Sequence, residues 1–255
     1  MTDEQRFLFD LKGFLVLESV LDTETLTRMR ADVDERGPRE VANSSFKSRF
    51  GGFLDWGPDW RALIDHPRTL PILRELLGER FRMDHAYGMA MSASGERGGE
   101  GLHHFAGMFD HGAYYATKGT QMHTGLLVVS FALYDVPPGA GGFCCIPGTH
   151  KSIHPMPQKW FGAYDNPHIV HVPMRAGDVV IFTESLTHGT LPWTCTTHER
   201  RAILLKYAPG YMQWANDPIA VKDPSKFTEQ QMRILQRAGG LMNRPQVASG
   251  KPGFG

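Results

Sequence analysis

The sequence lacks long hydrophobic runs. Its strongest apolar stretch, residues 126–134, is far shorter than the roughly 20 residues that a helix needs to cross a bilayer. The first segment, MTDEQRFLFDLKG, is acidic where a secretion signal would be basic, and it holds no clean apolar core. We therefore expect a soluble, cytoplasmic protein that has no membrane partner.

Cysteine and unbalanced charge are also scarce. The chain has three cysteines, of which Cys144 and Cys145 are adjacent, and this favours free thiols in a reducing compartment over disulfides. The 27 basic and 27 acidic residues cancel, which argues against a nucleic acid polymer as partner. A small molecule is therefore the expected partner, and the sequence indicates no particular oligomeric state.

The length of the chain suits one large domain. Because 255 residues can enclose a full hydrophobic core, we expect residues 1–255 to form a single domain with a loose tail over about 245–255. After residue 80, short apolar or alternating runs such as FRMDHAYGMAM, GLLVVSFALYDV and RRAILLKYAPG are separated by glycine, proline and aspartate turns. Many short strands with this punctuation predict a mainly β sandwich or barrel.

An early strand and three helices are also predicted, over residues 13–17, 23–34, 69–78 and 228–238. Asp22 is a suitable N-cap for the first helix, in which Leu26, Met29 and Val33 share one face. Gly78 is expected to end the second helix. These helices would flank the β-rich core.

A histidine and an arginine stand at the ends of two predicted strands. His188, in TESLTHGT, follows the strand GDVVIF, and Arg200, in HERRAILLKY, opens the next strand. This arrangement suits a metal ligand beside an anion-binding group, because a guanidinium is permanently charged and binds carboxylates bidentately. A surface histidine and a solvated arginine pair would give the same local sequence.

The segments around these two residues complete a longer pattern. FALYDV, GGFCCIPGTHK, AGDVVIF, His188 and Arg200 together resemble the phytanoyl-CoA dioxygenase family of iron(II)- and 2-oxoglutarate-dependent oxygenases. KGFLVLESVLDTETL is similar to that family's N-terminal strand and helix, so the resemblance covers most of residues 8–212. It implies a mainly β, double-stranded β-helix, a jelly-roll or cupin-like fold with flanking α-helices and with iron at its mouth.

The resemblance also implies cofactors and their ligands. Fe(II), 2-oxoglutarate and O₂ would be required, with His188 on the metal and Arg200, Thr190 and Ser130 around 2-oxoglutarate. The family's second metal motif is H-x-D or H-x-E, and its spacing suits a strand, where residues i and i+2 point to the same face. In this chain, no histidine is followed two residues later by an acid.

The segment LHHFAG, residues 102–107, looks like the strand end that would carry this motif. The residue at the acid's position is Phe105 if His103 is the ligand, and Ala106 if His104 is the ligand. Without the carboxylate, the iron complex has one negative charge fewer and one vacant coordination position. Chloride would supply the missing charge and fill the position. Halogenases of the 2-oxoglutarate class have H-x-A or H-x-G here. His104 is the preferred ligand because Ala106 leaves room for chloride, and His103 is the alternative.

Three functions remain open at this point. The first is a halogenase that chlorinates an unactivated C–H bond of a free small molecule, for example a nucleotide such as deoxyadenosine monophosphate. The second is a hydroxylase, with a carboxylate such as Asp110 from the following loop, or water, in the vacant position. The third is a non-catalytic jelly-roll binding protein.

The nucleotide hypothesis depends on basic residues that could hold a phosphate and on aromatic residues that could stack on a base. These residues are Lys47, Arg49, Arg61, Lys118, Lys206, Phe46, Phe50, Trp56 and Trp60. Solvated charges and core aromatics would explain the same pattern.

Overall fold

Two antiparallel sheets form the centre of the molecule. The computed structural model describes residues 1–37, 47–93, 100–103 and 112–239. The larger sheet has the order β1-β10-β7-β12-β3-β2, formed by β1 (Phe14–Leu17), β2 (Lys47–Phe50), β3 (Arg82–Met91), β7 (Leu127–Ala132), β10 (Val179–Thr183) and β12 (Arg200–Ala208). The smaller sheet has the order β4-β11-β8-β9, formed by β4 (Glu100–His103), β8 (Gly142–Cys145), β9 (Val170–His171) and β11 (His188–Leu191). A hairpin of β5 (Tyr115–Lys118) and β6 (Gln121–Thr124) completes the described strands.

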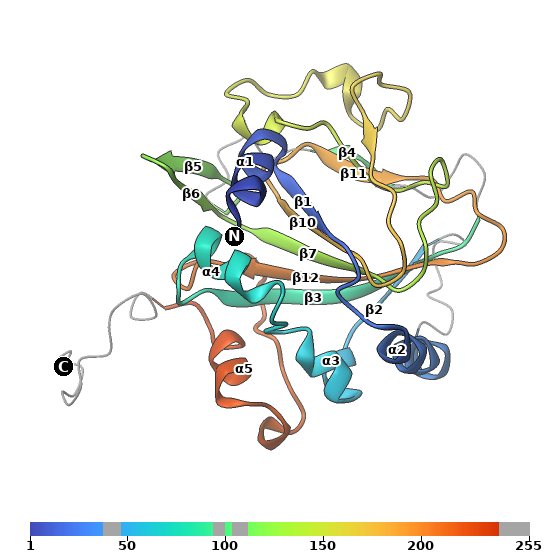
Figure 1. Ribbon diagram of the computed structural model, residues 1–255, viewed down its shortest axis with the longest axis vertical. Helices are drawn as coiled ribbons and strands as arrows, with labels where there is room; N and C mark the ends of the chain where they lie inside the picture. Colours follow the sequence, from blue (N-terminus) through green and yellow to red (C-terminus); the bar gives the residue numbers. More distant parts are fainter. Residues whose placement is uncertain (38–46, 94–99, 104–111, 240–255) are drawn as a thin grey trace.

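Helices cover the outer face of the larger sheet, and the smaller sheet faces its inner side (Figure 1). The described α-helices are α1 (Asp3–Lys12), α2 (Thr23–Arg36), α3 (Pro58–Ala62), α4 (Leu70–Leu77) and α5 (Glu229–Ile234), and the short 3-10 helices are η1 (Phe53–Asp55), η2 (Thr149–Lys151), η3 (Gln158–Trp160) and η4 (Pro224–Lys226). None of the helices in these ranges is long and apolar enough to span a membrane. The mainly β jelly roll with flanking helices that the sequence predicted is confirmed.

The alternation of side chains along β7 explains why this strand is apolar throughout. Leu127, Val129 and Phe131 pack against the helices, whereas Val128 and Ala132 pack between the sheets. The same period of two divides β10 and β12 into a helix-facing and an inward-facing set. A central strand with both faces covered has no solvent side, and this gives the continuous apolar run seen in the sequence.

Most of the predicted elements are present. The predicted strand at residues 13–17 is β1, and the first predicted helix is α2, where the Asp22 carboxylate accepts a hydrogen bond from the Thr25 amide at 2.7 Å. The three residues expected on its inner face are buried, namely Leu26, Met29 and Val33. Helix α4 ends at Gly78, as predicted.

Three helices differ from the prediction, and one of them, α3, was not predicted. Helix α1 was not predicted, although a capping box of Thr2 and Gln5 marks its start. The last helix ends at Ile234 instead of residue 238. Beyond its end, the Gln236 carbonyl accepts a hydrogen bond from the Arg82 guanidinium at 2.9 Å.

A buried charge network fixes the segment that follows β12. The Arg82 guanidinium donates to the Asp84 carboxylate at 2.6 Å, and both side chains are fully buried. Asp84 also accepts hydrogen bonds from the backbone amides of Trp214 and Ala215, each at 2.9 Å. Burial alone would raise the pKa of Asp84, but the hydrogen bonds outweigh burial and hold this pKa well below its ordinary value.

We predict that Asp84→Asn lowers the free energy of unfolding by about 3–5 kcal/mol, because it leaves the buried Arg82 charge without its partner. Urea denaturation at pH 7 measures this loss. Asp34→Asn is the matched control, since Asp34 is mostly exposed in its ion pair with Arg201 and its removal should cost much less.

The pKa of Asp84 is lowered in the folded state, so its stabilisation is present above the unfolded pKa of about 4 and disappears as the pH falls below it. The difference between wild type and Asp84→Asn should therefore narrow in acid. A constant difference across this range would contradict the role of the charge.

Candidate metal and cosubstrate site

A cavity of about 460 Å³ lies between the two sheets. Five residues that the sequence singled out line it together, namely His103, Ser130, His188, Thr190 and Arg200. Side chains that were not assigned to this site, or that were considered only for phosphate or base binding, also line it, including Arg49, Tyr87, Glu184, Lys206 and Trp214. Strand alternation explains part of this set, because Arg200, Leu204 and Lys206 are separated by even numbers of residues on β12.

The two histidines meet because their strands are neighbours. β4 and β11 pair antiparallel, and His103 stands directly opposite His188 in their register. The centroids of the two imidazole rings are 4.2 Å apart. Side chains directly opposite on paired strands lie on the same face of the sheet, so both rings project into the cavity.

Hydrogen bonds to the backbone orient both imidazoles. The Nδ1 of His188 lies 2.7 Å from the Leu186 carbonyl, and the Nδ1 of His103 lies 3.1 Å from the Gly101 carbonyl. Because a carbonyl oxygen only accepts, each Nδ1 carries the proton and each Nε2 keeps a lone pair. This is the usual arrangement of a metal-binding histidine. Burial lowers the pKa of His188 to about 4, so its ring is neutral at pH 7.

A carboxylate completes the group. Glu184, His103 and His188 each offer one ligand atom, and these atoms all lie within 4.8 Å of one another. The Oε2 of Glu184 is 3.9 Å from the Nε2 of His188. Two imidazoles and one carboxylate on one side of a cavity are the ligand set of non-haem iron(II) oxygenases. The donor chemistry therefore fits iron(II).

Sequence reasoning missed Glu184. It stands four residues before His188, in the turn between β10 and β11 that the Thr183 carbonyl and the Leu186 amide close at 3.0 Å. Its spacing to His188, E-x-x-x-H across a turn, differs from the H-x-D or H-x-E spacing of the family's motif.

The Glu184 carboxylate is buried and paired. Its side chain is 3% exposed, and its Oε1 accepts a hydrogen bond from the Lys206 ammonium at 2.5 Å. Burial alone would raise the pKa of Glu184, but the charge and the hydrogen bond of Lys206 outweigh burial and lower it. The carboxylate is therefore ionised at neutral pH.

Arg200 provides a buried cation on another wall of the cavity. Its side chain is 4% exposed, and its Nη1 contacts the sulfur atoms of Met89 and Met91 at 3.5 and 3.6 Å. Gly142 makes room for it, because a Cβ at that position would lie 3.0 Å from the Arg200 Nε. With Thr190 on the same lining, this wall suits the distal carboxylate of a dicarboxylate.

Five of the residues considered at the sequence level lie outside the described residues. These are Phe46, His104, Phe105, Ala106 and Asp110. The preference for His104 over His103, and the halide position at Ala106, therefore stay predictions. Of the two candidate histidines, His103 is the one that the described structure brings together with His188.

The described residues considered for phosphate and base binding lie in different parts of the molecule, and Arg61 and Lys118 are not among the residues that line the cavity. Arg49 and Lys206 line the cavity, and the Arg49 guanidinium lies 4.6 Å from the centre of the Tyr87 ring. Phe50, Trp56 and Trp60 instead pack with one another and against the core under the helices. The described aromatic side chain next to a cavity cation is therefore Tyr87.

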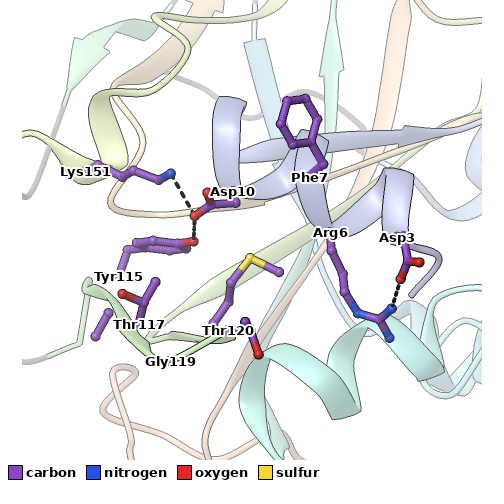
Figure 2. A pocket seen from close by; sticks show the side chains of 11 residues that line it. Asp3, Arg6, Phe7, Asp10, Tyr115, Thr117, Gly119, Thr120 and Lys151 are labelled. Carbon is purple, nitrogen blue, oxygen red and sulfur yellow. Dashed lines mark hydrogen bonds and ion pairs between the residues drawn. The ribbon is translucent and has the colours of Figure 1, made fainter.

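A second cavity, of about 740 Å³, lies between α1 and the β5–β6 hairpin (Figure 2). Its charged groups satisfy one another. The Asp10 carboxylate accepts hydrogen bonds from Lys151 and Tyr115, and Arg6 pairs with Asp3 at 2.7 Å. Within the described ranges, the group of converging metal donors belongs to the other cavity, so the chemistry is expected there.

Comparisons with known proteins identify a family and a fold for this chain. The family model described as Phytanoyl-CoA dioxygenase (PhyH) matches residues 9–202. No curated relative matches the sequence. HygX from Streptomyces hygroscopicus, solved with nickel and 2-oxoglutarate bound, superposes with a TM-score of 0.73 at 21% identity, over 86% of this chain and 93% of HygX.

Two proteins of nogalamycin biosynthesis have the same fold. The epimerase SnoN, in complex with Fe³⁺, alpha-ketoglutarate and nogalamycin RO, gives a TM-score of 0.62 at 20% identity, over 82% of this chain and 84% of SnoN. The carbocyclase SnoK gives 0.60 at 21% identity, over 82% and 85%. At these identities the likeness establishes the fold.

We predict that His103→Ala and His188→Ala each weaken the binding of Co(II), used as an air-stable substitute for iron(II), by at least ~10-fold. Isothermal titration calorimetry measures this change. His104→Ala and the exposed His123→Ala should bind Co(II) as the wild type does. Loss of binding in His104→Ala with retention in His103→Ala would reverse the assignment of the ligand.

Proposed function

The chain belongs to the phytanoyl-CoA dioxygenase family of iron(II)- and 2-oxoglutarate-dependent oxygenases, and from this premise we propose that it oxidises an unactivated C–H bond of a free small molecule, with hydroxylation as the outcome. One observation carries the proposal. The converging donors of His103, His188 and Glu184 share a cavity with the buried Arg200 cation.

The side chains divide the work of such a reaction. His103 and His188 would hold iron through their Nε2 atoms, because each Nδ1 donates to a backbone carbonyl. Arg200 would hold the distal carboxylate of 2-oxoglutarate, and Thr190 and Ser130, which line the same cavity, would offer hydroxyl donors. When bound, iron and 2-oxoglutarate supply the chemistry, in which O₂ converts 2-oxoglutarate to succinate and CO₂ and oxidises the substrate.

The charges of the cavity favour anionic ligands. Among the described lining residues, Arg49, Arg200 and Lys206 are cationic and Glu184 is the carboxylate. After 2-oxoglutarate neutralises Arg200, the Arg49 guanidinium and the adjacent Tyr87 ring offer a cation beside an aromatic face. We therefore propose a substrate that carries an anionic group, and the nucleotide predicted from the sequence belongs to this class.

Halogenation is the second candidate function. It is favoured by the absence of an acid two residues after His103 or His104. Halogenation requires a coordination position that chloride can occupy. The Glu184 carboxylate lies beside both imidazoles and would take that position, so we place hydroxylation first. A non-catalytic binding protein is the third possibility, and it requires that iron and 2-oxoglutarate produce no succinate.

We predict that Arg200→Met raises the KM for 2-oxoglutarate by about 10- to 100-fold, because it removes a charge-assisted hydrogen bond from a buried site. Succinate formation under iron(II) and O₂ measures the KM. Arg201→Met is the matched control, since the neighbouring residue on the strand pairs with Asp34 and Glu199 away from the cavity. Equal KM values for the two variants would refute the role of Arg200.

We also predict that product formation does not depend on chloride. The wild type, reconstituted anaerobically with iron(II) and 2-oxoglutarate and then exposed to O₂, should hydroxylate an accepted member of a panel of nucleotides and amino acids with or without chloride. Mass spectrometry distinguishes the products, and replacement of chloride by bromide is the control. A product that gains chlorine, or bromine after the exchange, would establish halogenation instead.

A further inference from the structure

We propose that Glu184 is the carboxylate ligand of the metal, provided by the turn between β10 and β11 in place of the acid that H-x-D or H-x-E motifs place on the strand of the first histidine. The inference rests on the proposed function, because it takes His103 and His188 as the other two ligands. It assigns a role to a residue outside the family's motif.

The orientation of the carboxylate supports this role. The Oε1 of Glu184 is occupied by the Lys206 ammonium at 2.5 Å, which leaves Oε2 as the atom that faces His188 at 3.9 Å. His103, His188 and Glu184 come from β4, from the start of β11 and from the turn before it. These three donors would hold the metal together, as two histidines and one carboxylate do in non-haem iron(II) oxygenases.

The backbone holds Glu184 in place. Its amide donates to the Leu126 carbonyl at 3.0 Å, and the Leu186 amide donates to the Thr183 carbonyl at 3.0 Å across the turn. The side chain is 3% exposed, so the carboxylate cannot be explained as a surface charge. A buried carboxylate is costly unless a charge or a metal compensates it.

Lys206 supplies that compensation before a metal binds. Its ammonium side chain is 15% exposed and reaches the cavity from β12. The ion pair holds Oε1 at 2.5 Å from the ammonium, so the orientation of the carboxylate is set before a metal binds. Once bound, the carboxylate would fill the coordination position, and supply the negative charge, that a halogenase gives to chloride.

The experiment removes the carboxylate without leaving a buried charge unpaired. Glu184→Gln alone would remove the carboxylate that pairs with the Lys206 ammonium, and this could prevent folding. The main variant is therefore the double substitution Glu184→Gln with Lys206→Met. Lys206→Met alone shows how much of the change in Co(II) affinity is caused by the loss of the lysine. Asp110→Asn tests the acid proposed from the sequence as the alternative source. Circular dichroism confirms that each variant is folded.

Co(II) titration of the whole chain, followed by calorimetry and by visible absorption, is the measurement. We expect the double variant to bind Co(II) at least ~10-fold more weakly than both the wild type and Lys206→Met, with a changed visible spectrum, and Asp110→Asn to match the wild type. Equal affinity and spectrum in the wild type and the double variant would overturn the role of Glu184. So would equal weakening in Lys206→Met and the double variant.

A chloride titration tests independently whether Glu184 fills this coordination position. Titration with chloride should leave the Co(II) spectrum of the wild type unchanged and alter that of the double variant, where the carboxylate no longer fills the site. A chloride response in the wild type would overturn the proposal. If the wild type binds neither Co(II) nor iron(II), the proposed function fails as well, whereas binding that is indifferent to Glu184 contradicts only this inference.

Discussion

The buried ion pair between Glu184 and Lys206 constrains the whole site. One partner lies in the turn that joins the two sheets through β10 and β11, and the other lies on β12 of the larger sheet. Neither charge is stable in this environment alone, so the pair fixes the distance between the turn and the strand. His188, four residues after Glu184, and Arg200, six residues before Lys206, thereby keep their places on the same cavity.

Much of the fold and part of the site could be predicted from the sequence. Short apolar runs with turn residues gave the strands, and the period of two places Ser130 and Arg200 on inward faces. His188, Thr190 and Arg200 line one cavity with His103. Glu184 was missed because its approach to His103 depends on strand pairing between distant segments, which local spacing does not contain. Helix α1 was missed although its capping box was readable.

The comparison with HygX, SnoN and SnoK shows that proteins with one fold can catalyse different reactions. All share this fold at about a fifth of identical residues, and two of them are described as an epimerase and a carbocyclase. In such a family the outcome of the reaction depends on the ligand that completes the metal and on the position of the substrate. The family match therefore identifies the class of chemistry, and individual side chains decide its result.

The hydrogen bonds of the two imidazoles affect which residues of the cavity can change in sequence. His103 and His188 each donate to a carbonyl two residues earlier in their own segment, so no other side chain is needed to hold these bonds. Other residues that line the cavity, such as Tyr87 and Trp214, can then be exchanged without loss of these two hydrogen bonds. The two histidines are thus held by main-chain geometry, whereas the other lining residues can be substituted to suit a new substrate.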